Sequence, residues 1–172
     1  MKRIIFVLAM MFLMGCGGQD QAAITEKKEK TSPMPSMASN PSIQVDKLLQ
    51  QATSSLQKGD YLAAIKTLDV AIQRDRQDVR PYLLLGETYM RLQRYDKAVD
   101  TLIAALPFAP DSGQLNYLLA VNYHFQGAEK EAMQYAENSI KIFGQNKDEE
   151  NFKKSLVLLQ GLKSESAPTK SN

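Results

Sequence analysis

The sequence predicts an all-α protein built from antiparallel helix pairs. Between residues 41 and 164, apolar residues recur at intervals of three and four, the spacing of one helix face, and no segment alternates strictly as a half-buried strand does. Similar residues also recur with a period of 34. A period of that length is typical of chains in which one helical unit stacks on the next. The expected fold is therefore a solenoid of helix pairs.

Seven helices are expected from the apolar spacing and from residues that favour helix ends. Starts are indicated by Asn40 before Pro41, by Asp78, and by Asp111 with Ser112, because such side chains accept hydrogen bonds from the first free backbone N–H groups. Glycines and prolines between the apolar segments indicate the breaks. The expected helices span 41–58, 61–74, 79–92, 95–106, 112–126, 129–143 and 147–163.

The 34-residue period is clearest where the residue is small. Two helices can approach closely only where their side chains are small, so a small residue at a fixed place sets the separation of each pair. The period therefore has a packing cause. Three columns of small residues follow it: Ala52, Gly86 and Ala120; Ala64, Ala98 and Ala132; and Ala71, Ala105 and Ser139.

Two stretches, Gly59–Ile65 and Arg94–Val99, resemble the turn and second helix of the tetratricopeptide repeat. The second repeat fits best and has Pro110 at its end, whereas Arg76 and Gly144 replace this proline in the first and third repeats. Terminal repeats of a solenoid are commonly atypical because one side faces solvent. The resemblance implies a right-handed superhelix of three repeats, at about 45–78, 79–112 and 113–146.

A last helix, at 147–163, has no partner helix after it and is expected to cap the third repeat. The repeat domain is then expected to span 41–164. The polar residues 165–172 are expected to form a disordered tail.

Residues 1–15 have the features of a lipoprotein signal peptide. A basic start precedes the apolar run Ile4–Met14, which is too short to span a membrane. The following sequence, Leu13-Met14-Gly15-Cys16, resembles a lipobox, which implies cleavage before Cys16 and acylation of its thiol. An ordinary secretory peptide or an uncleaved anchor is the alternative. The lipobox resemblance implies a lipid-anchored protein of the cell envelope. If the cell has two membranes, the periplasmic face of the outer membrane is favoured, because Gly17 and not Asp follows the cysteine.

The segment 16–40 is expected to be a disordered tether behind the acylated cysteine. It is rich in Gly, Gln, Lys, Glu, Thr, Ser and Pro, and it cannot bury enough apolar surface to offset its chain entropy. A flexible coil of this length spans about 25–30 Å. The tether could therefore hold a domain clear of a membrane surface.

Charge and residue counts argue against several classes of function. Without Lys2 and Arg3 of the signal peptide, the chain has 19 basic and 19 acidic residues, so no nucleic-acid partner is expected. Cys16 and His124 are the only residues of their kinds. Because no nucleophile, phosphate loop or ligand spacing accompanies them, the sequence predicts no catalytic residue, no metal site and no cofactor. His124 is expected to be a polar residue of a binding face or a satisfied, half-buried residue.

In the tetratricopeptide family the first helix of each repeat lines an inner groove, and the resemblance assigns ten residues to it. They recur at i, i+4 and i+7, and an apolar strip of this kind usually marks a protein contact. The alternative occupant is the C-terminal helix or the tether. The ten residues are Leu49, Thr53, Leu56, Leu83, Glu87, Met90, Tyr117, Val121, His124 and Phe125.

These features predict a membrane-anchored interaction scaffold of the cell envelope that binds a peptide or helix of an envelope protein. A pilotin-like assembly or transport factor for a secretin or type IV pilus is the second interpretation, and it rests on architecture alone. An envelope hydrolase is the alternative from another class.

Overall fold

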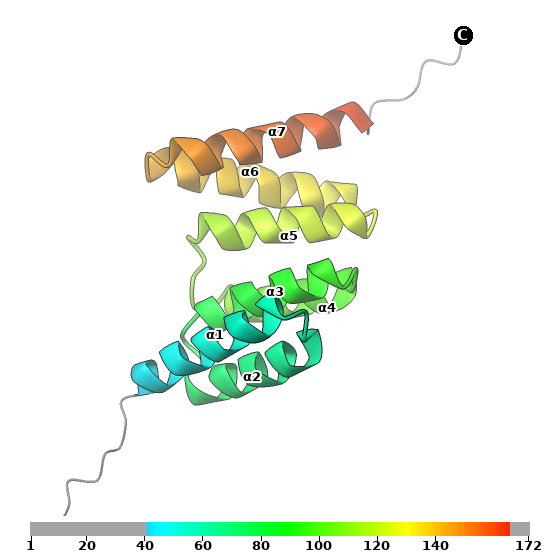
Figure 1. Cartoon of the computed structure of the whole chain (residues 1–172). Coiled ribbons are helices and arrows are strands. Elements are labelled where there is room, and N and C mark those ends of the chain that lie inside the picture. Colours follow the sequence, from blue (N-terminus) through cyan, green and yellow to red (C-terminus); the bar gives the residue numbers. More distant parts are fainter. Residues whose placement is uncertain (1–40, 166–172) are drawn as a thin grey trace, which may run out of the picture. The chain divides into compact units, whose positions relative to one another are not determined.

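The computed structural model describes residues 41–165, and these form seven α-helices and no strand (Figure 1). The described residues belong to one compact unit. Three antiparallel pairs and a last helix follow in order: α1 (Pro41–Gln57) with α2 (Tyr61–Arg74), α3 (Arg80–Arg91) with α4 (Tyr95–Ala105), α5 (Gly113–Phe125) with α6 (Glu129–Gln145), and α7 (Glu149–Glu165). The all-α prediction of stacked helix pairs is confirmed.

Each predicted helix is present, and its ends lie within two residues of the predicted ones. Differences of two residues occur at the end of α6 and at both ends of α7, which includes Glu165, a residue predicted to lie in the tail. The lipidation residue Cys16, the signal peptide 1–15 and the tether 16–40 lie outside the described residues.

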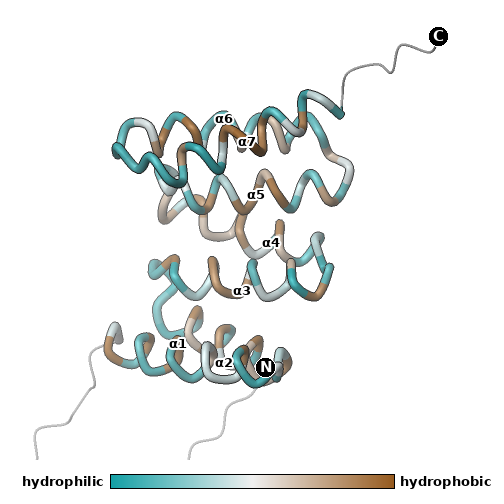
Figure 2. Tube along the Cα trace, turned by 45° about the horizontal axis from the view of Figure 1, so that its top comes forward, coloured by the Kyte–Doolittle hydropathy of each residue, from teal (hydrophilic) through white to brown (hydrophobic). Residues whose placement is uncertain are grey.

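Hydrophobic and hydrophilic residues gather on different faces of most helices, whereas α5 is buried around most of its circumference. Figure 2 shows both kinds of residue along every helix of the described chain. Among residues 41–165, no helix combines the length and the apolar character that crossing a membrane requires. The hydrophobic faces are instead buried between neighbouring helices.

The core consists of clusters that join one helix pair to the next. Leu68 of α2 packs with Leu85 of α3. Leu102 of α4, which has no exposed surface, packs with Leu115 and Leu119 of α5. Residues of α7, including Leu159, pack against the alanines of α5 and α6. Since α7 covers the third repeat in the way that α3 and α5 cover the first and second, it closes the stack.

The small-residue columns lie at the closest helix contacts, as their spacing predicts. All nine members are buried. A Cβ atom added to Gly86 of α3 would lie 2.7 Å from Cδ2 of Leu102 in the paired helix α4. That distance is far inside van der Waals contact, so the absence of a side chain at Gly86 allows α3 and α4 to approach.

The turns within the pairs repeat one backbone conformation. Gly59 and Gly127 both have φ of +76°, and Gln93 has φ of +56°. The three residues stand 34 apart. Glycine adopts this left-handed conformation without steric cost, whereas an L side chain such as that of Gln93 does not. The second repeat therefore makes its turn with a residue that disfavours it.

Side-chain caps fix several helix starts. Asp60 accepts a hydrogen bond from the backbone N–H of Ala63, and Ser112 accepts one from that of Leu115. The start predicted at Ser112 is thus confirmed. The carboxylate of Asp78 accepts from the N–H of Arg80, but the residue that precedes α3 is Val79, which makes no side-chain cap.

Two glycine substitutions should separate backbone strain from packing. We expect Gly127→Ala to lower the free energy of unfolding by roughly 1–2 kcal/mol, because its left-handed backbone opposes a Cβ. In contrast, Gly161→Ala within α7 should stabilise the protein by up to about 1 kcal/mol through helix propensity. At neither glycine would the new Cβ meet an atom within 4 Å. Urea unfolding followed by circular dichroism measures both changes in the free energy of unfolding. A change of the same sign at both positions would contradict the attribution of the Gly127 effect to backbone strain.

Candidate binding groove

The first helices of the repeats border three shallow depressions along one side of the stack. The first, of about 240 Å³, lies between α1 and α3 and is lined by Thr53, Leu56, Gln57, Leu84, Glu87, Thr88 and Arg91. A second of the same volume connects α3 to Gln114 of α5. The third, of about 370 Å³, lies where α3, α5 and α7 meet and is lined by Glu87, Gln114, Tyr117, Leu118, Phe143, Asp148, Asn151 and Lys154. We call the three together the groove.

Glu87 is the one residue that borders all three depressions. Its carboxylate is partly buried and accepts a hydrogen bond from the Gln114 amide at 3.4 Å, which is long for such a bond. A partly desolvated carboxylate with one weak partner can accept a further donor from a bound chain. Glu87 is thus the central polar group of the groove.

The α7 side of the groove is polar, and its charges are already engaged. Asp148 accepts hydrogen bonds from the side chain and the backbone N–H of Asn151, and these hold the pKa of Asp148 below its usual value. Lys154 donates to Glu150, which raises the pKa of Lys154. This wall therefore offers hydrogen-bonding groups and little unpaired charge.

Five of the ten residues that the sequence assigns to the groove line these depressions. They are Thr53, Leu56, Leu83, Glu87 and Tyr117. The other five, Leu49, Met90, Val121, His124 and Phe125, line none of the three.

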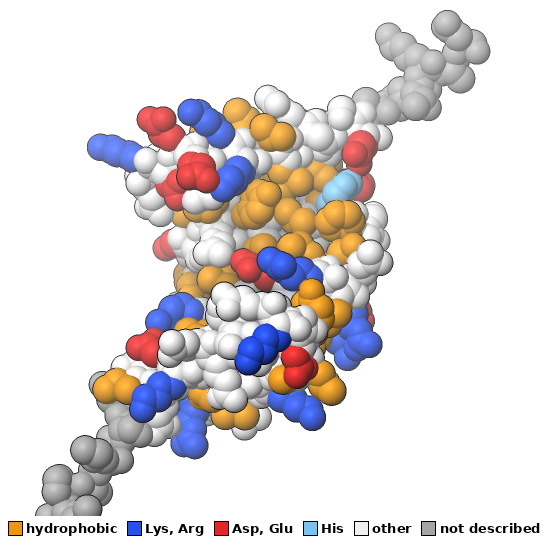
Figure 3. All heavy atoms as spheres, in the orientation of Figure 1, with side chains coloured by type: hydrophobic (Ala, Val, Ile, Leu, Met, Phe, Trp, Pro, Cys, Tyr) orange, Lys and Arg blue, Asp and Glu red, His pale blue; other side chains and the backbone are white. Residues whose placement is uncertain are grey.

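Two of these five residues, Leu49 and Phe125, pack against residues outside the groove. Leu49 is partly buried and lies against the core cluster of Ala52, Leu68 and Leu85. Phe125 is 54% exposed and stacks on Tyr95 of α4, with ring centroids 4.8 Å apart. Figure 3 shows hydrophobic side chains gathered over α5 in the hollow between α3 and α7, beside the single histidine. An apolar surface thus extends from the groove toward the end of α5.

The groove is also lined by residues that stand next to the predicted ones. Leu84, Thr88 and Leu118 line the groove beside Leu83, Glu87 and Tyr117. The inner face of each first helix is therefore two residues wide, and a strict i, i+4, i+7 pattern selects only half of it. The residues of α7 were missed because that helix was interpreted as a cap or as an occupant of the groove, and not as one of its walls.

The helix α7 packs against α6 and α5 and does not fill the depression between α1 and α3. Its first turns form one wall of the third depression. The helix α7 therefore leaves the depression between α1 and α3 unfilled and borders the groove only at α5. The tether, the other occupant considered, lies outside the described residues.

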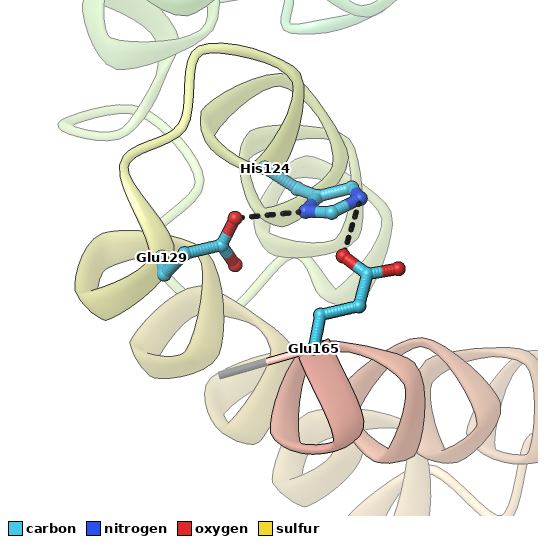
Figure 4. A group of neighbouring side chains, drawn as sticks. All are labelled: His124, Glu129 and Glu165. Carbon is cyan, nitrogen blue, oxygen red and sulfur yellow. Dashed lines mark hydrogen bonds and ion pairs between the residues drawn. The ribbon is translucent and has the colours of Figure 1, made fainter. Parts of the chain in front are cut away.

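His124 stands at the far end of α5 among carboxylates (Figure 4). Its Nδ1 lies 3.3 Å from Oε1 of Glu129, and its Nε2 lies 3.7 Å from Oε2 of Glu165. The imidazole is half-buried, as the sequence suggests, but its neighbours come from α6 and α7. Sequence spacing does not indicate this cluster, because Glu165 reaches His124 only through the stacking of α7.

The family model of the tetratricopeptide repeat matches residues 55–122. No curated protein matches this sequence. Among solved structures, the Yersinia enterocolitica type III secretion translocator chaperone SycD is similar, with a TM-score of 0.68 and 18% identity over 73% of this chain and 96% of SycD.

Two further similar structures are complexes with another protein. PcrH of Pseudomonas aeruginosa, solved with the chaperone binding region of PopD, has a TM-score of 0.67 and 15% identity over 72% of this chain and 94% of PcrH. The TPR2B domain of yeast Sti1, solved in complex with pHsp70, has a TM-score of 0.67 and 13% identity over 72% of this chain and 98% of that domain. The described chain therefore has an all-α solenoid fold of the tetratricopeptide type.

Proposed function

We propose that this protein is a membrane-anchored interaction scaffold of the cell envelope that binds a peptide or helix of another protein in its groove. The observation that supports this most is the continuous line of depressions along α1, α3, α5 and the start of α7, which share Glu87. The groove is open along its length, as an elongated ligand requires. The lipobox resemblance at Cys16 supports the anchor.

The chemistry of the groove favours a ligand with apolar anchors and hydrogen-bonding groups between them. Leu56 and Tyr117 offer apolar surface on either side of Glu87. The complexes of PcrH and of the Sti1 domain also support a protein ligand, since their fold is the same. The proposed function needs no cofactor.

The test is a pair of substitutions in the groove. Leu56→Ser with Tyr117→Ser should weaken partner binding by about 2 kcal/mol or more, because interface energy is concentrated in a few large anchors. The matched control is Leu62→Ser with Val70→Ser, which removes two exposed apolar residues of α2 that do not line the groove. A photo-crosslinking amino acid in place of Gln114 first identifies the partner, and titration of the purified partner then gives each affinity.

The control pair should leave the affinity unchanged. Circular dichroism must show that both variants keep the helical fold. If the groove variant folds and still binds as the parent protein does, or if the α2 variant loses binding instead, the ligand lies on another face and the groove assignment is wrong.

A further inference from the structure

Three helix ends bring metal-binding side chains together away from the groove depressions. His124 lies near the end of α5, Glu129 is the first residue of α6, and Glu165 is the last residue of α7 (Figure 4). One coordinating atom from each side chain lies within 4.8 Å of the other two. Their side chains are 26%, 35% and 62% exposed, so the cluster is half-buried yet open to ions from solvent.

Hydrogen bonding within the protein leaves this cluster incomplete. Each ring nitrogen of His124 faces a different carboxylate, Nδ1 that of Glu129 and Nε2 that of Glu165. In addition, Oε2 of Glu129 is buried and has no hydrogen-bond partner within the described chain. A buried carboxylate oxygen without a partner is costly. A bound cation would give this oxygen the partner that it lacks among the described residues.

We propose that His124, Glu129 and Glu165 bind one divalent transition-metal ion of the zinc type. Because the three ligand atoms lie within 4.8 Å of one another, an ion at their centre is at most about 2.8 Å from each. Zinc binds imidazole nitrogen and carboxylate oxygen at roughly 2.0–2.2 Å. The two carboxylates face different ring nitrogens of His124, so the binding of one ion also requires the Glu165 side chain, at the exposed end of α7, to turn toward the nitrogen that Glu129 faces.

The ligand set favours zinc over the hard cations. One imidazole with two carboxylates suits Zn²⁺ and similar ions, whereas Mg²⁺ and Ca²⁺ prefer oxygen ligands alone. Three protein ligands leave a coordination position for water or for an acceptor on a partner protein. A bound ion would also tie the end of α7 to α5 and α6. This inference does not depend on the proposed groove function.

The test uses the full chain in detergent with Cys16→Ser, which removes the only thiol, after treatment with a chelator. Titration with ZnCl₂, followed by calorimetry and by competition with a chromogenic chelator, should show one ion per chain. We expect His124→Gln and Glu165→Gln each to weaken zinc binding at least tenfold. The matched control is Glu131→Gln, an exposed carboxylate on the same first turn of α6 as Glu129, which should leave the affinity unchanged.

A second readout is thermal unfolding, in which ZnCl₂ should raise the midpoint of the parent protein and of Glu131→Gln but not of His124→Gln. If His124→Gln does not fold, Glu165→Gln at the exposed helix end decides the question. Zinc binding that survives both substitutions, or a parent protein that binds MgCl₂ as tightly as ZnCl₂, overturns the proposal. So does a parent protein that binds no zinc.

Discussion

Replacing Leu102 by alanine should lower the free energy of unfolding by about 2–5 kcal/mol. Leu102 has no exposed surface, and it packs against Tyr82 in its own repeat and against Leu115 and Leu119 of the next. The substitution opens a cavity at the joint between two helix pairs. Urea unfolding followed by circular dichroism at 222 nm measures the loss, and Leu156→Ala on the exposed face of α7 should cost far less.

A double-mutant cycle with Gly86 tests the same contact more strictly, because the Leu102 side chain fills the space that a side chain at Gly86 would need. On its own, Gly86→Ala should destabilise the protein by about 1–3 kcal/mol, since the new Cβ meets the Leu102 side chain at 2.7 Å. In the Leu102→Ala protein the same methyl group enters the space that leucine has vacated. The two changes should therefore be non-additive by at least about 1 kcal/mol. Additive losses in the double-mutant cycle would show that Gly86 does not set the spacing of α3 and α4.

The fold could be predicted from the sequence because its determinants are local and repeated. A small residue at Gly86 has counterparts at Ala52 and Ala120, and all three are buried at the same helix contact. The turn residues Gly59 and Gly127 repeat with the same period. Since each repeat contacts only its neighbours, a pattern read from one repeat holds for the next. Long-range information is scarcely needed for such a fold.

The groove was only half predicted, because its boundary depends on how each helix is rotated. Leu83 and Leu84 both line it, although the apolar period alone distinguishes them poorly. At the other end, Leu49 fits the groove pattern but lies partly buried against a core cluster and lines none of the depressions. A difference of one residue corresponds to about 100° around a helix. Sequence spacing therefore finds the correct side of the solenoid but not the width of its binding surface.

The cluster around His124 could not be predicted from the spacing of residues in the sequence, and the reason differs from that for the groove. Glu129 is five residues away across a tight turn, but Glu165 joins through the return of α7 along α6. Metal sites recognised from sequence place several ligands on one helix or loop at fixed intervals. Here each of three helices supplies one ligand. Such a site becomes visible only when the stacking of the last helix is known.

The largest change in cellular behaviour is expected at Cys16, whose substitution by alanine should remove the protein from the membrane fraction or leave an uncleaved precursor. Each buried CH₂ of an acyl chain contributes about 0.8 kcal/mol to membrane binding, and stable anchoring takes more than one chain. With no other cysteine in the sequence, no second thiol can replace it. Labelling with a fatty-acid probe, together with cell fractionation, measures both effects, and Gly18→Ala in the tether is the control that should keep label and location. Lipid label that persists in Cys16→Ala would contradict the lipobox assignment, and the proposed scaffold would then need another means of reaching the envelope.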